Sequence, residues 1–538
     1  MTAVKVDLSQ LDDPGCRRPL LVRRGAVATS QPLAAAVGLR VLQDGGSAVD
    51  AAIATAACLT VVEPCSTGLG SDAFALVWDN GVLHGLNGSG RSPAALSAEA
   101  LRGRGLRSVP YRGWEAVTVP GAVQAWADLH ARFGRLDFAD LLEPAAQYAD
   151  EGFLVSPVVA AAWQRSADEV QPGLRDAAHA EWGHSFTISG RSPRAGELWR
   201  QPEQAVTLRA LAASGGRDLY GGRLAAQLVR HAEATGGYLT LDDLARHRST
   251  WVAPISASYR GHQVWELPPN GQGIAALMAL GILDGADLAP DPQNVDWWHT
   301  QIEAMKLALT DTHAFGADPE MAEVPVAAML SAENLARLRA LIRPRARQPV
   351  PGEPSGSHTV LLVTADNDGQ LVSFIQSNYD GFGSHIVVPN TGIALQNRGA
   401  GFSLQSGHPN ELAARKRPFH TIIPAFLTRD GEPIGPFGVT GAHMQPQGHV
   451  QVISHTLDQG DDPQTALGRA RWFWRQGREV LLEPTVPQYI ADGLAARGHQ
   501  VGYGDRSWEF GRGQAIWRLD DGYVVGSEPR ADSHAMGW

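Results

Sequence analysis

HTVLLVTADNDGQLVSFIQSNY, the stretch that spans residues 358–379, decides the fold prediction. It holds two apolar runs, TVLLVTA and QLVSFIQS, on either side of the turn DNDG (366–369). An Asp-Gly turn between two runs rich in β-branched and aromatic residues is typical of a tight hairpin. The sequence therefore predicts two buried antiparallel strands, the first of which begins at Thr359.

The segment before this hairpin has a different character. Residues 341–358, LIRPRARQPVPGEPSGSH, are rich in Pro, Gly, Ser and Arg, as exposed and flexible loops are. Thr359 thus opens a buried strand directly after an accessible loop. A Thr at this place is ordinary, because β-branched residues favour strands, so the residues alone leave a purely structural role open.

The rest of the chain mixes long helices with hairpins. We expect one helix over 32–46, ended by two glycines, and another over 50–59, where DAAIATAACL is apolar on almost every face. The triplet DNG (79–81) between AFALVW and VLHGLN indicates a second hairpin. An α+β fold with helices layered on antiparallel sheets is the expected result. The length of 538 residues fits either one large interwoven domain or several smaller ones.

The composition excludes several classes of protein. The formal net charge is −11, and no run of Lys or Arg is long enough to bind nucleic acid. Cys16, Cys58 and Cys65 have no paired or metal-ligand spacing, which argues against a disulfide framework and for a reducing compartment. No HExxH motif or Cys-rich ligand set occurs, so we expect no metal and no cofactor. Without a signal-like or membrane-spanning apolar stretch, the protein is predicted to be cytoplasmic and to have no membrane partner.

Several longer motifs are similar to those of one family. They are GGSAVDAAIATAACLTVVEPCSTGLGSDAFALVWD (45–79), VPGAVQAWADLHARFGRL (119–136), ELPPNGQG (266–273), KRPFHTIIP (416–424) and EPRADSHAMGW (528–538). With the hairpin described above, the chain resembles the γ-glutamyltransferase (γ-glutamyltranspeptidase) family along nearly its whole length. The motifs GFGS and MQPQGH are similar to those of a glutathione hydrolase-like branch of that family.

The resemblance implies an N-terminal-nucleophile hydrolase with a four-layer αββα sandwich. Such a protein is made as a proenzyme that cuts its own chain, here between His358 and Thr359. The products would be a large subunit, 1–358, and a small subunit, 359–538, which remain associated as one interwoven domain. A higher homo-oligomer is left open.

The resemblance also implies catalytic roles. Thr359 is the expected nucleophile, and its newly freed α-amine, with a pKa of about 8, is the expected base. Ser377 matches the hydroxyl residue that orients the nucleophile, with a structural hydroxyl as the alternative. The main-chain amides of Met444 and Gln445 match the donors of the family's oxyanion hole. An Asn of the family, two positions after Ser377, is replaced here by Tyr379.

The expected substrate pocket departs from the family pattern. Where the family grips its glutamyl donor with an Arg, a Gln or Glu, an Asp and two Ser, this sequence has Ser89 with Arg91 nearby, Arg398, Gly401, and His420 with Thr421. Arg398 reverses the local charge and favours a substrate carboxylate, with a structural salt bridge as the alternative. Gly401 offers no anion to a substrate ammonium. His420 is either an acid-base group of the site or a packed loop histidine.

We therefore expect an enzyme that forms an acyl ester on Thr359 from a small-molecule amide and passes the acyl group to water or another acceptor. The expected donor is a γ-glutamyl amide or a similar short acidic acyl amide. Within the same class, the alternative is an acylase or amidase for des-amino acyl amides, either glutaryl-like or oxamate-like. In a different class, the chain would be an uncleaved binding relative without activity.

Overall fold

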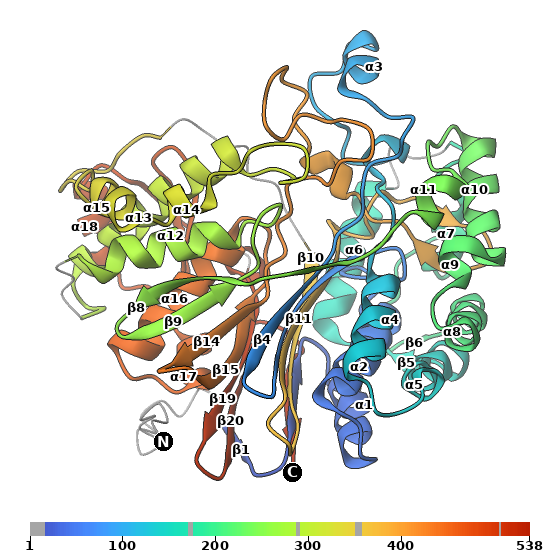
Figure 1. The fold of residues 1–538 in the computed structure, drawn as a ribbon, viewed down its shortest axis with the longest axis horizontal. Coiled ribbons are helices and arrows are strands. Elements are labelled where there is room, and N and C mark those ends of the chain that lie inside the picture. The colour runs from blue at the N-terminus through green and yellow to red at the C-terminus, as the bar shows by residue number, and fades with distance from the viewer. Residues whose placement is uncertain (1–16, 171–175, 287–290, 350–357, 505–506) are drawn as a thin grey trace.

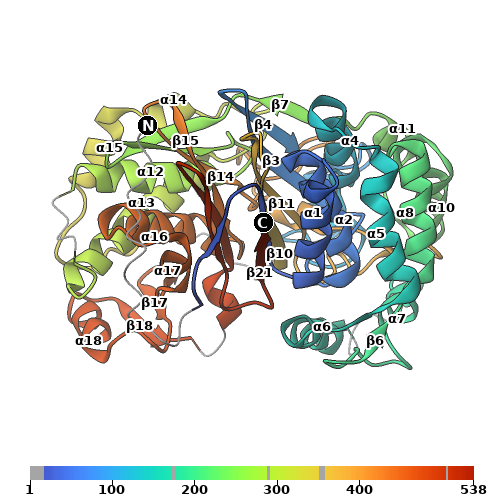
Figure 2. The ribbon, with the colours of Figure 1, turned by 90° about the horizontal axis from the view of Figure 1, so that it is seen from below.

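Two β-sheets stacked face to face form the centre of the molecule (Figure 1). The computed structural model describes residues 17–170, 176–286, 291–349, 358–504 and 507–538. Helices cover the outer face of each sheet (Figures 1 and 2). The fold is therefore mixed α+β, which confirms the predicted class.

The first sheet has seven antiparallel strands in the order β21-β2-β10-β11-β3-β4-β7. Their bounds are β2 Ala26–Thr29, β3 Asp72–Asp79, β4 Val82–Gly88, β7 Thr250–Val252, β10 His358–Ala365, β11 Leu371–Tyr379 and β21 His534–Gly537. The hairpin predicted from residues 358–379 is thus the β10–β11 pair in the middle of this sheet.

The second sheet also has seven antiparallel strands, in the order β1-β20-β19-β15-β14-β9-β8. Their bounds are β1 Leu20–Val22, β8 Ile255–Tyr259, β9 His262–Glu266, β14 Ala425–Arg429, β15 Glu432–Val439, β19 Gly513–Leu519 and β20 Gly522–Ser527. Smaller sheets pair β5 (Phe153–Leu154) with β6 (Leu198–Trp199), β12 (Val387–Val388) with β13 (Ile393–Ala394), and β16 (Trp472–Gln476) with β17 (Glu479–Leu482) and β18 (Gln500–Tyr503).

Strands from both sides of Thr359 contribute to each large sheet. In the first sheet, β10 and β11 lie between β2 and β3. In the second sheet, β14, β15, β19 and β20 lie between β1 on one side and β9 with β8 on the other. Neither 1–358 nor 359–538 therefore has a large sheet of its own.

Three hydrophobic cores separate the layers. The core between the two sheets includes Phe74, Leu361, Ile375, Phe426 and Ile516. A second core lies between the first sheet and its helices, and a third between the second sheet and its helices. Burial of this much apolar surface is the main stabilising contribution to such a fold.

The helices fall into two groups. On the side of the first sheet are α1 Pro32–Gln43, α2 Ala48–Val62, α4 Ala122–Phe133, α5 Phe138–Glu151, α8 Pro202–Ser214 and α10 Arg223–Thr235. On the side of the second sheet are α12 Gly273–Asp284, α13 Val295–Phe315, α15 Ala332–Arg339, α16 Met444–Asp458, α17 Pro463–Gly468 and α18 Gln488–Ala496. The remaining α-helices of the described residues are α3 Ala98–Gly103, α6 Pro157–Val170, α7 Ala180–Phe186, α9 Asp218–Gly221, α11 Leu241–Ala245 and α14 Val326–Met329.

The first two helices follow the sequence signals closely. α1 stops just before Gly45, whose φ of +95° is a conformation that favours glycine. α2 is longer than predicted, because Ser47 and Asp50 form a capping box that starts it at Ala48. Every residue of α2 is buried, as the absence of a polar face in its sequence indicates.

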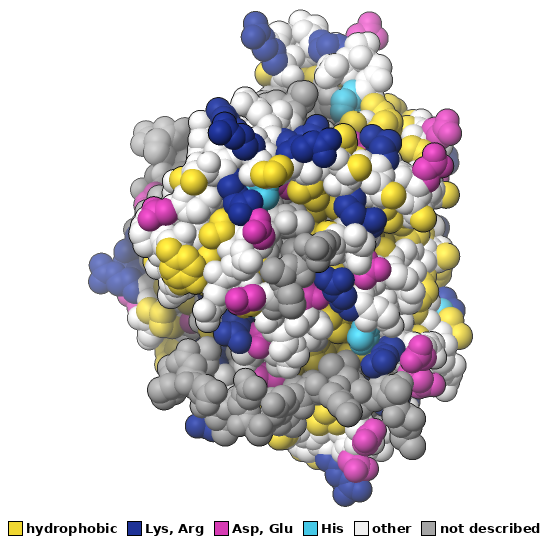
Figure 3. Space-filling model, turned by 90° about the vertical axis from the view of Figure 1, so that its left-hand side faces the viewer, with side chains coloured by type: hydrophobic (Ala, Val, Ile, Leu, Met, Phe, Trp, Pro, Cys, Tyr) yellow, Lys and Arg dark blue, Asp and Glu magenta, His cyan; other side chains and the backbone are white. Residues whose placement is uncertain are grey.

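The surface and the cysteines add little chemistry. Cys58 and Cys65 are buried free thiols, whereas Cys16 lies outside the described residues. The face shown in Figure 3 has Lys and Arg side chains interspersed with Asp and Glu. Over the described part of the chain, no helix is both long enough and apolar enough to cross a membrane.

Candidate active site

Three neighbouring strands bring polar residues to one edge of the first sheet. β10 begins at this edge with Thr359 as its second residue, and β11 ends there shortly after Ser377. β3 begins at the same edge with Asp72, which is the register partner of Ser377. Sheet topology thus gathers the predicted nucleophile, the predicted positioning hydroxyl and a buried carboxylate.

A bulge controls how Thr359 enters this edge. His358 pairs with Tyr379, whereas Val360 pairs with Gln376, so the single residue Thr359 faces two residues of β11. Bulges of this kind bend a strand and re-aim a side chain. The Thr359 side chain is buried, and residues 350–357 of the predicted loop before it lie outside the described residues.

The hydroxyl groups of Thr359 and Ser377 are in direct contact. Thr359 Oγ1 lies 3.0 Å from Ser377 Oγ. The Tyr379 amide donates to Ser377 Oγ at 2.8 Å, which fixes the Ser377 hydroxyl in its rotamer. The two residues expected to act together are therefore brought together by the hairpin.

Asn378, the residue between Ser377 and Tyr379, lies opposite Thr359 in the same bulge. Its Oδ1 accepts from the Ser71 hydroxyl at 2.8 Å. Its buried Nδ2 has no hydrogen-bond partner among the described residues. A Cβ on Gly68 would lie 3.3 Å from this nitrogen, so the glycine leaves room beside it. Asn378 Nδ2 is thus an unused donor on a residue that lies opposite Thr359 in the strand register.

Arg398, at the start of the 3₁₀ turn η2 (Arg398–Gly401), is almost completely buried. Its Nη1 donates to Thr421 Oγ1 at 2.6 Å, while Nε and Nη2 have no hydrogen-bond partner among the described residues. Burial lowers the pKa of Arg398 to about 10, so the guanidinium stays charged at neutral pH. The two unused nitrogens lie on one edge of the guanidinium, the edge that binds a carboxylate with two parallel hydrogen bonds.

Two tyrosines complete the surroundings of Arg398. The Arg398 Cζ lies 4.1 Å from the centre of the Tyr379 ring, within the range of a cation–π contact. The Tyr111 hydroxyl donates to the Tyr379 hydroxyl at 3.0 Å, and the two rings stack with centroids 5.7 Å apart. Tyr111 was not predicted from the sequence, because it lies in an irregular segment distant from every motif used for the site.

Asp72 and His420 form a buried pair beside this cluster. His420 Nε2 lies 3.1 Å from Asp72 Oδ2, and both side chains are fully buried. Burial, and then the charge of Arg398, keeps the pKa of His420 well below its usual value, so the ring is neutral. Burial raises the pKa of Asp72 to about 7, although Arg398 opposes this shift. Sequence reasoning missed Asp72, whose only signals were its place in GLGSD and at a strand start.

The predicted oxyanion donors are engaged within their own turn. The amide of Met444 donates to the Gly441 carbonyl at 2.9 Å, and that of Gln445 to the Ala442 carbonyl at 3.1 Å. The Gln445 side chain accepts from the Ile423 amide through Oε1, whereas its Nε2 has no partner among the described residues. In this conformation the Gln445 side chain, and not the two amides, offers an open donor.

Arg91 has carboxylate partners of its own. Its Nη1 lies 3.1 Å from Asp318 Oδ2, and its Nη2 lies 2.8 Å from Glu320 Oε1. Nη1 also donates to the Arg415 carbonyl. These contacts occupy the Arg91 guanidinium as those of a structural ion pair do.

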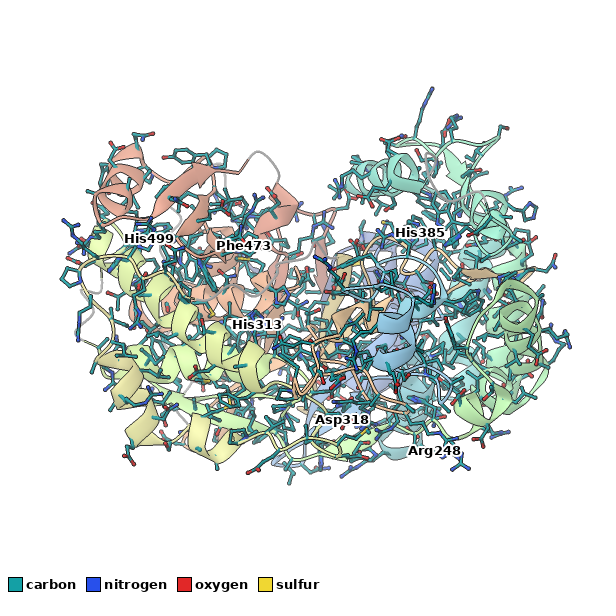
Figure 4. The ribbon with its side chains drawn as sticks, turned by 90° about the horizontal axis from the view of Figure 1, so that it is seen from above. Arg248, His313, Asp318, His385, Phe473 and His499 are labelled. Carbon is teal, nitrogen blue, oxygen red and sulfur yellow. The ribbon has the colours of Figure 1, made fainter. Side chains whose placement is uncertain are left out.

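A group of side chains with metal-like spacing lies elsewhere. Among the described residues, ligand atoms of His299, Glu303 and His499 fall within 4.8 Å of one another. Lys306 Nζ donates to Glu303 Oε1 at 2.8 Å and lies 3.4 Å from His499 Nδ1, so an ammonium already supplies the positive charge. Figure 4 places His499 farther from the middle of the molecule than His313. This group fits a hydrogen-bond network better than a metal site.

Comparison with known proteins identifies the class. The sequence profile described as Gamma-glutamyltranspeptidase matches residues 34–538. The chain therefore belongs to the γ-glutamyltranspeptidase family, and it is an amidohydrolase of that family.

Three relatives illustrate the range of the family. A glutathione hydrolase-like YwrD proenzyme of Bacillus subtilis is 37% identical over 522 residues, covering 95% of this chain and 98% of that protein. An oxamate amidohydrolase proenzyme of Klebsiella pneumoniae is 34% identical over 531 residues, covering 96% and 98%. The crystal structure of cephalosporin acylase from Bacillus halodurans matches with a TM-score of 0.95 and 49% identity, covering 98% of both chains. Because these names differ in substrate, the family alone does not decide the acyl group.

Proposed function

We propose that the protein hydrolyses short amides whose acyl group ends in a carboxylate, with Thr359 as the nucleophile and Arg398 as the receptor of that carboxylate. The 3.0 Å contact between Thr359 and Ser377 supports the reaction, since a positioned hydroxyl partner is what such a nucleophile needs. The substrate class rests on one observation, the buried Arg398 with two unused donors.

The proposed nucleophile becomes active by cleavage of the chain between His358 and Thr359. In the intact chain, β10 runs through both residues, so the Thr359 nitrogen is an amide and cannot act as a base. Cleavage would yield chains 1–358 and 359–538 and free an α-amine beside the Thr359 hydroxyl. The names of two relatives, both called proenzymes, support this step. The layered fold would then be the αββα sandwich of an N-terminal-nucleophile hydrolase.

The chemistry follows from these groups. The Thr359 hydroxyl attacks the amide carbon and gives its proton to its own α-amine, while Ser377 orients the hydroxyl. The tetrahedral oxyanion needs donors, and Asn378 Nδ2 and Gln445 Nε2 are open donors in this conformation. The amides of Met444 and Gln445 would serve only after they leave the Gly441 and Ala442 carbonyls. The leaving amine takes the proton, and an ester remains on Thr359. Water then cleaves the ester and releases the free acid.

The name of one relative supports an acidic acyl group as the donor. Oxamate, named for the Klebsiella relative, carries a carboxylate directly beside its amide. The donor edge of Arg398 would bind such a group, with Thr421 holding the third nitrogen of the guanidinium. His420, kept neutral beside Asp72, would line this pocket without adding a charge.

A γ-glutamyl donor is the second candidate, and Asp72 favours it. The loss of an acid at Gly401 suggested a pocket without an anion, yet Asp72 supplies a buried carboxylate that interacts electrostatically with Arg398. A substrate ammonium near Asp72 would stabilise the charged carboxylate. However, Asp72 is already bound to the Gly90 amide and to His420, which leaves Arg398 as the more open group.

Three anilide donors of similar length distinguish a preference for a des-amino acidic acyl group from a preference for a γ-glutamyl group. Glutaryl, γ-glutamyl and valeryl anilides differ in whether they carry a carboxylate alone, a carboxylate with an ammonium, or neither. We expect kcat/KM for the glutaryl donor to be at least that for the γ-glutamyl donor and well above that for the valeryl donor. A strong preference for the γ-glutamyl donor would instead establish the second candidate. Equal kcat/KM values for the glutaryl and valeryl donors would show that Arg398 does not bind the acyl carboxylate.

A further inference from the structure

We infer that Tyr379 sets the selectivity for an anionic acyl group, because its ring holds Arg398 while its main chain holds Ser377. This inference rests on the function proposed above. It assigns Tyr379 the role of a positioning residue, which acts on the substrate through Arg398 and does not take part in the chemical step.

The main chain of Tyr379 is held in an unusual conformation. Its φ is +80°, in a region that residues other than glycine rarely adopt, and the side chain is buried. In this conformation the Tyr379 amide donates to Ser377 Oγ at 2.8 Å. Unusual backbone angles persist where the surroundings require them, and they gather at functional sites. Here the same turn that directs the amide to Ser377 also carries the ring to Arg398.

The Arg398 guanidinium lies over the ring of Tyr379. With Cζ 4.1 Å from the ring centre, the ring attracts the cation without using an N–H group. Thr421 takes Nη1, so Nε and Nη2 remain for a ligand. No ion pair within 4 Å between Arg398 and a carboxylate occurs among the described residues, so the ring and Thr421 supply the contacts that orient it.

Tyr111 supports the ring of Tyr379 through a hydroxyl contact and a stacked ring. Its hydroxyl donates to that of Tyr379 at 3.0 Å, and its ring stacks on the Tyr379 ring with an interplanar angle of 29°. The phenol contact fixes the ring in its plane, whereas the cation–π contact needs only the ring itself. The two contributions can therefore be separated by removing the hydroxyl or the whole ring.

The test compares Tyr379→Leu with Tyr379→Phe. Leu removes the ring but lacks a branch at Cβ, which the positive φ would penalise, and it keeps the amide that binds Ser377. Phe keeps the ring and loses only the contact with Tyr111. For each variant, kcat/KM is measured with glutaryl and valeryl anilides on one preparation, because the ratio of the two values does not depend on the folded fraction.

We expect Tyr379→Leu to lower the glutaryl-to-valeryl ratio by roughly 5- to 30-fold, the range of a desolvated cation–π contact, mainly through a higher KM for the glutaryl donor. Tyr379→Phe should keep the ratio within about twofold. In an Arg398→Gln background, Tyr379→Leu should change the ratio by less than about twofold, since the ring acts through Arg398. If Tyr379→Leu is not recovered as folded protein, Tyr379→Met replaces it in the same comparison.

The outcomes separate the two proposals. If the wild type does not prefer the glutaryl donor, the proposed function fails, whatever the Tyr379 variants do. If the wild type prefers it and the variants without a ring keep the ratio, the inference about Tyr379 is wrong and the function stands. An equal loss of both donors in Tyr379→Leu would likewise overturn the inference, because it would show a general structural role.

Discussion

Thr359 Oγ1 and Ser377 Oγ lie 3.0 Å apart on adjacent strands, 18 residues apart in the chain. The hairpin alone would place residues near each other, but the bulge at Thr359 aims its side chain at Ser377. The amide of Tyr379 also donates to the Ser377 oxygen and holds it in place. This contact is the geometric basis of the proposed reaction.

Replacing Ser377 by Ala should slow turnover without weakening binding. We expect kcat to fall by about 10²-fold, the size associated with a lost positioned hydrogen bond, with little change in KM. Ser373→Ala is the matched control, because Ser373 lies on the same strand and donates to the Phe437 carbonyl at 3.0 Å. A change confined to KM in Ser377→Ala would contradict the positioning role.

Replacing Arg398 by Gln should act on one kind of donor. We expect kcat/KM for the glutaryl anilide to fall by roughly 10- to 100-fold, because charge-assisted hydrogen bonds to the carboxylate are lost. The valeryl anilide should be affected by less than about threefold. Arg91→Gln is the control, since that guanidinium binds Asp318 and Glu320. Equal losses with both donors would argue against a carboxylate receptor at Arg398.

Acid should destabilise the fold through buried neutral histidines such as His385. Burial lowers its pKa to about 3, and its Nε2 lies 2.8 Å from the Gly381 carbonyl. Below the unfolded-state pKa of about 6.5, the unfolded chain binds a proton that the folded state does not. The free energy of unfolding should therefore fall as the pH drops from about 6.5 toward 3, by up to about 1.4 kcal/mol per pH unit for this residue.

The variant His385→Asn tests this contribution, because Asn tolerates the φ of +60° at this position. Urea unfolding at several pH values should show a shallower loss of stability on acidification than in the wild type. His184→Asn, on an exposed side chain, is the control. A pH slope in His385→Asn equal to that of the wild type would show that His385 does not contribute to acid sensitivity.

The two chains formed by cleavage should stay together under native conditions. β10 and β11 lie between β2 and β3, so separating 359–538 from 1–358 would break the pairing of both central strands. We expect a single peak in gel filtration and two bands on a denaturing gel. Two separate peaks from a cleaved and folded sample would contradict the prediction that strand pairing holds the two chains together.

The sequence predicts the local part of the site well. Thr359 and Ser377 lie on one hairpin, and the turn DNDG with its flanking β-rich runs is enough to pair them. The glycine after α1 and the capping residues of α2 likewise act within a few residues. Arg398 was found because it reverses a charge in a recognisable motif.

The long-range part could not be predicted from one sequence. Asp72 and His420 are 348 positions apart, and only the order of strands and loops brings them to 3.1 Å. Arg91 is two residues from Ser89, which occupies the position of the family's substrate-binding Arg. Its side chain nevertheless binds Asp318, and no local sequence pattern indicates this contact. The turn before α16 engages the amides of Met444 and Gln445, a feature that depends on backbone angles and not on residue type.

Mass spectrometry of the purified protein under denaturing conditions shows whether Thr359 becomes the first residue of a separate chain. We expect two chains, residues 1–358 and 359–538, for the wild type. We expect a single uncut, inactive chain for Thr359→Ala, because the same hydroxyl serves both cleavage and turnover. A small chain that begins at another residue, or a Thr359→Ala protein that still cuts itself and hydrolyses amides, would contradict the assignment of Thr359 as the nucleophile.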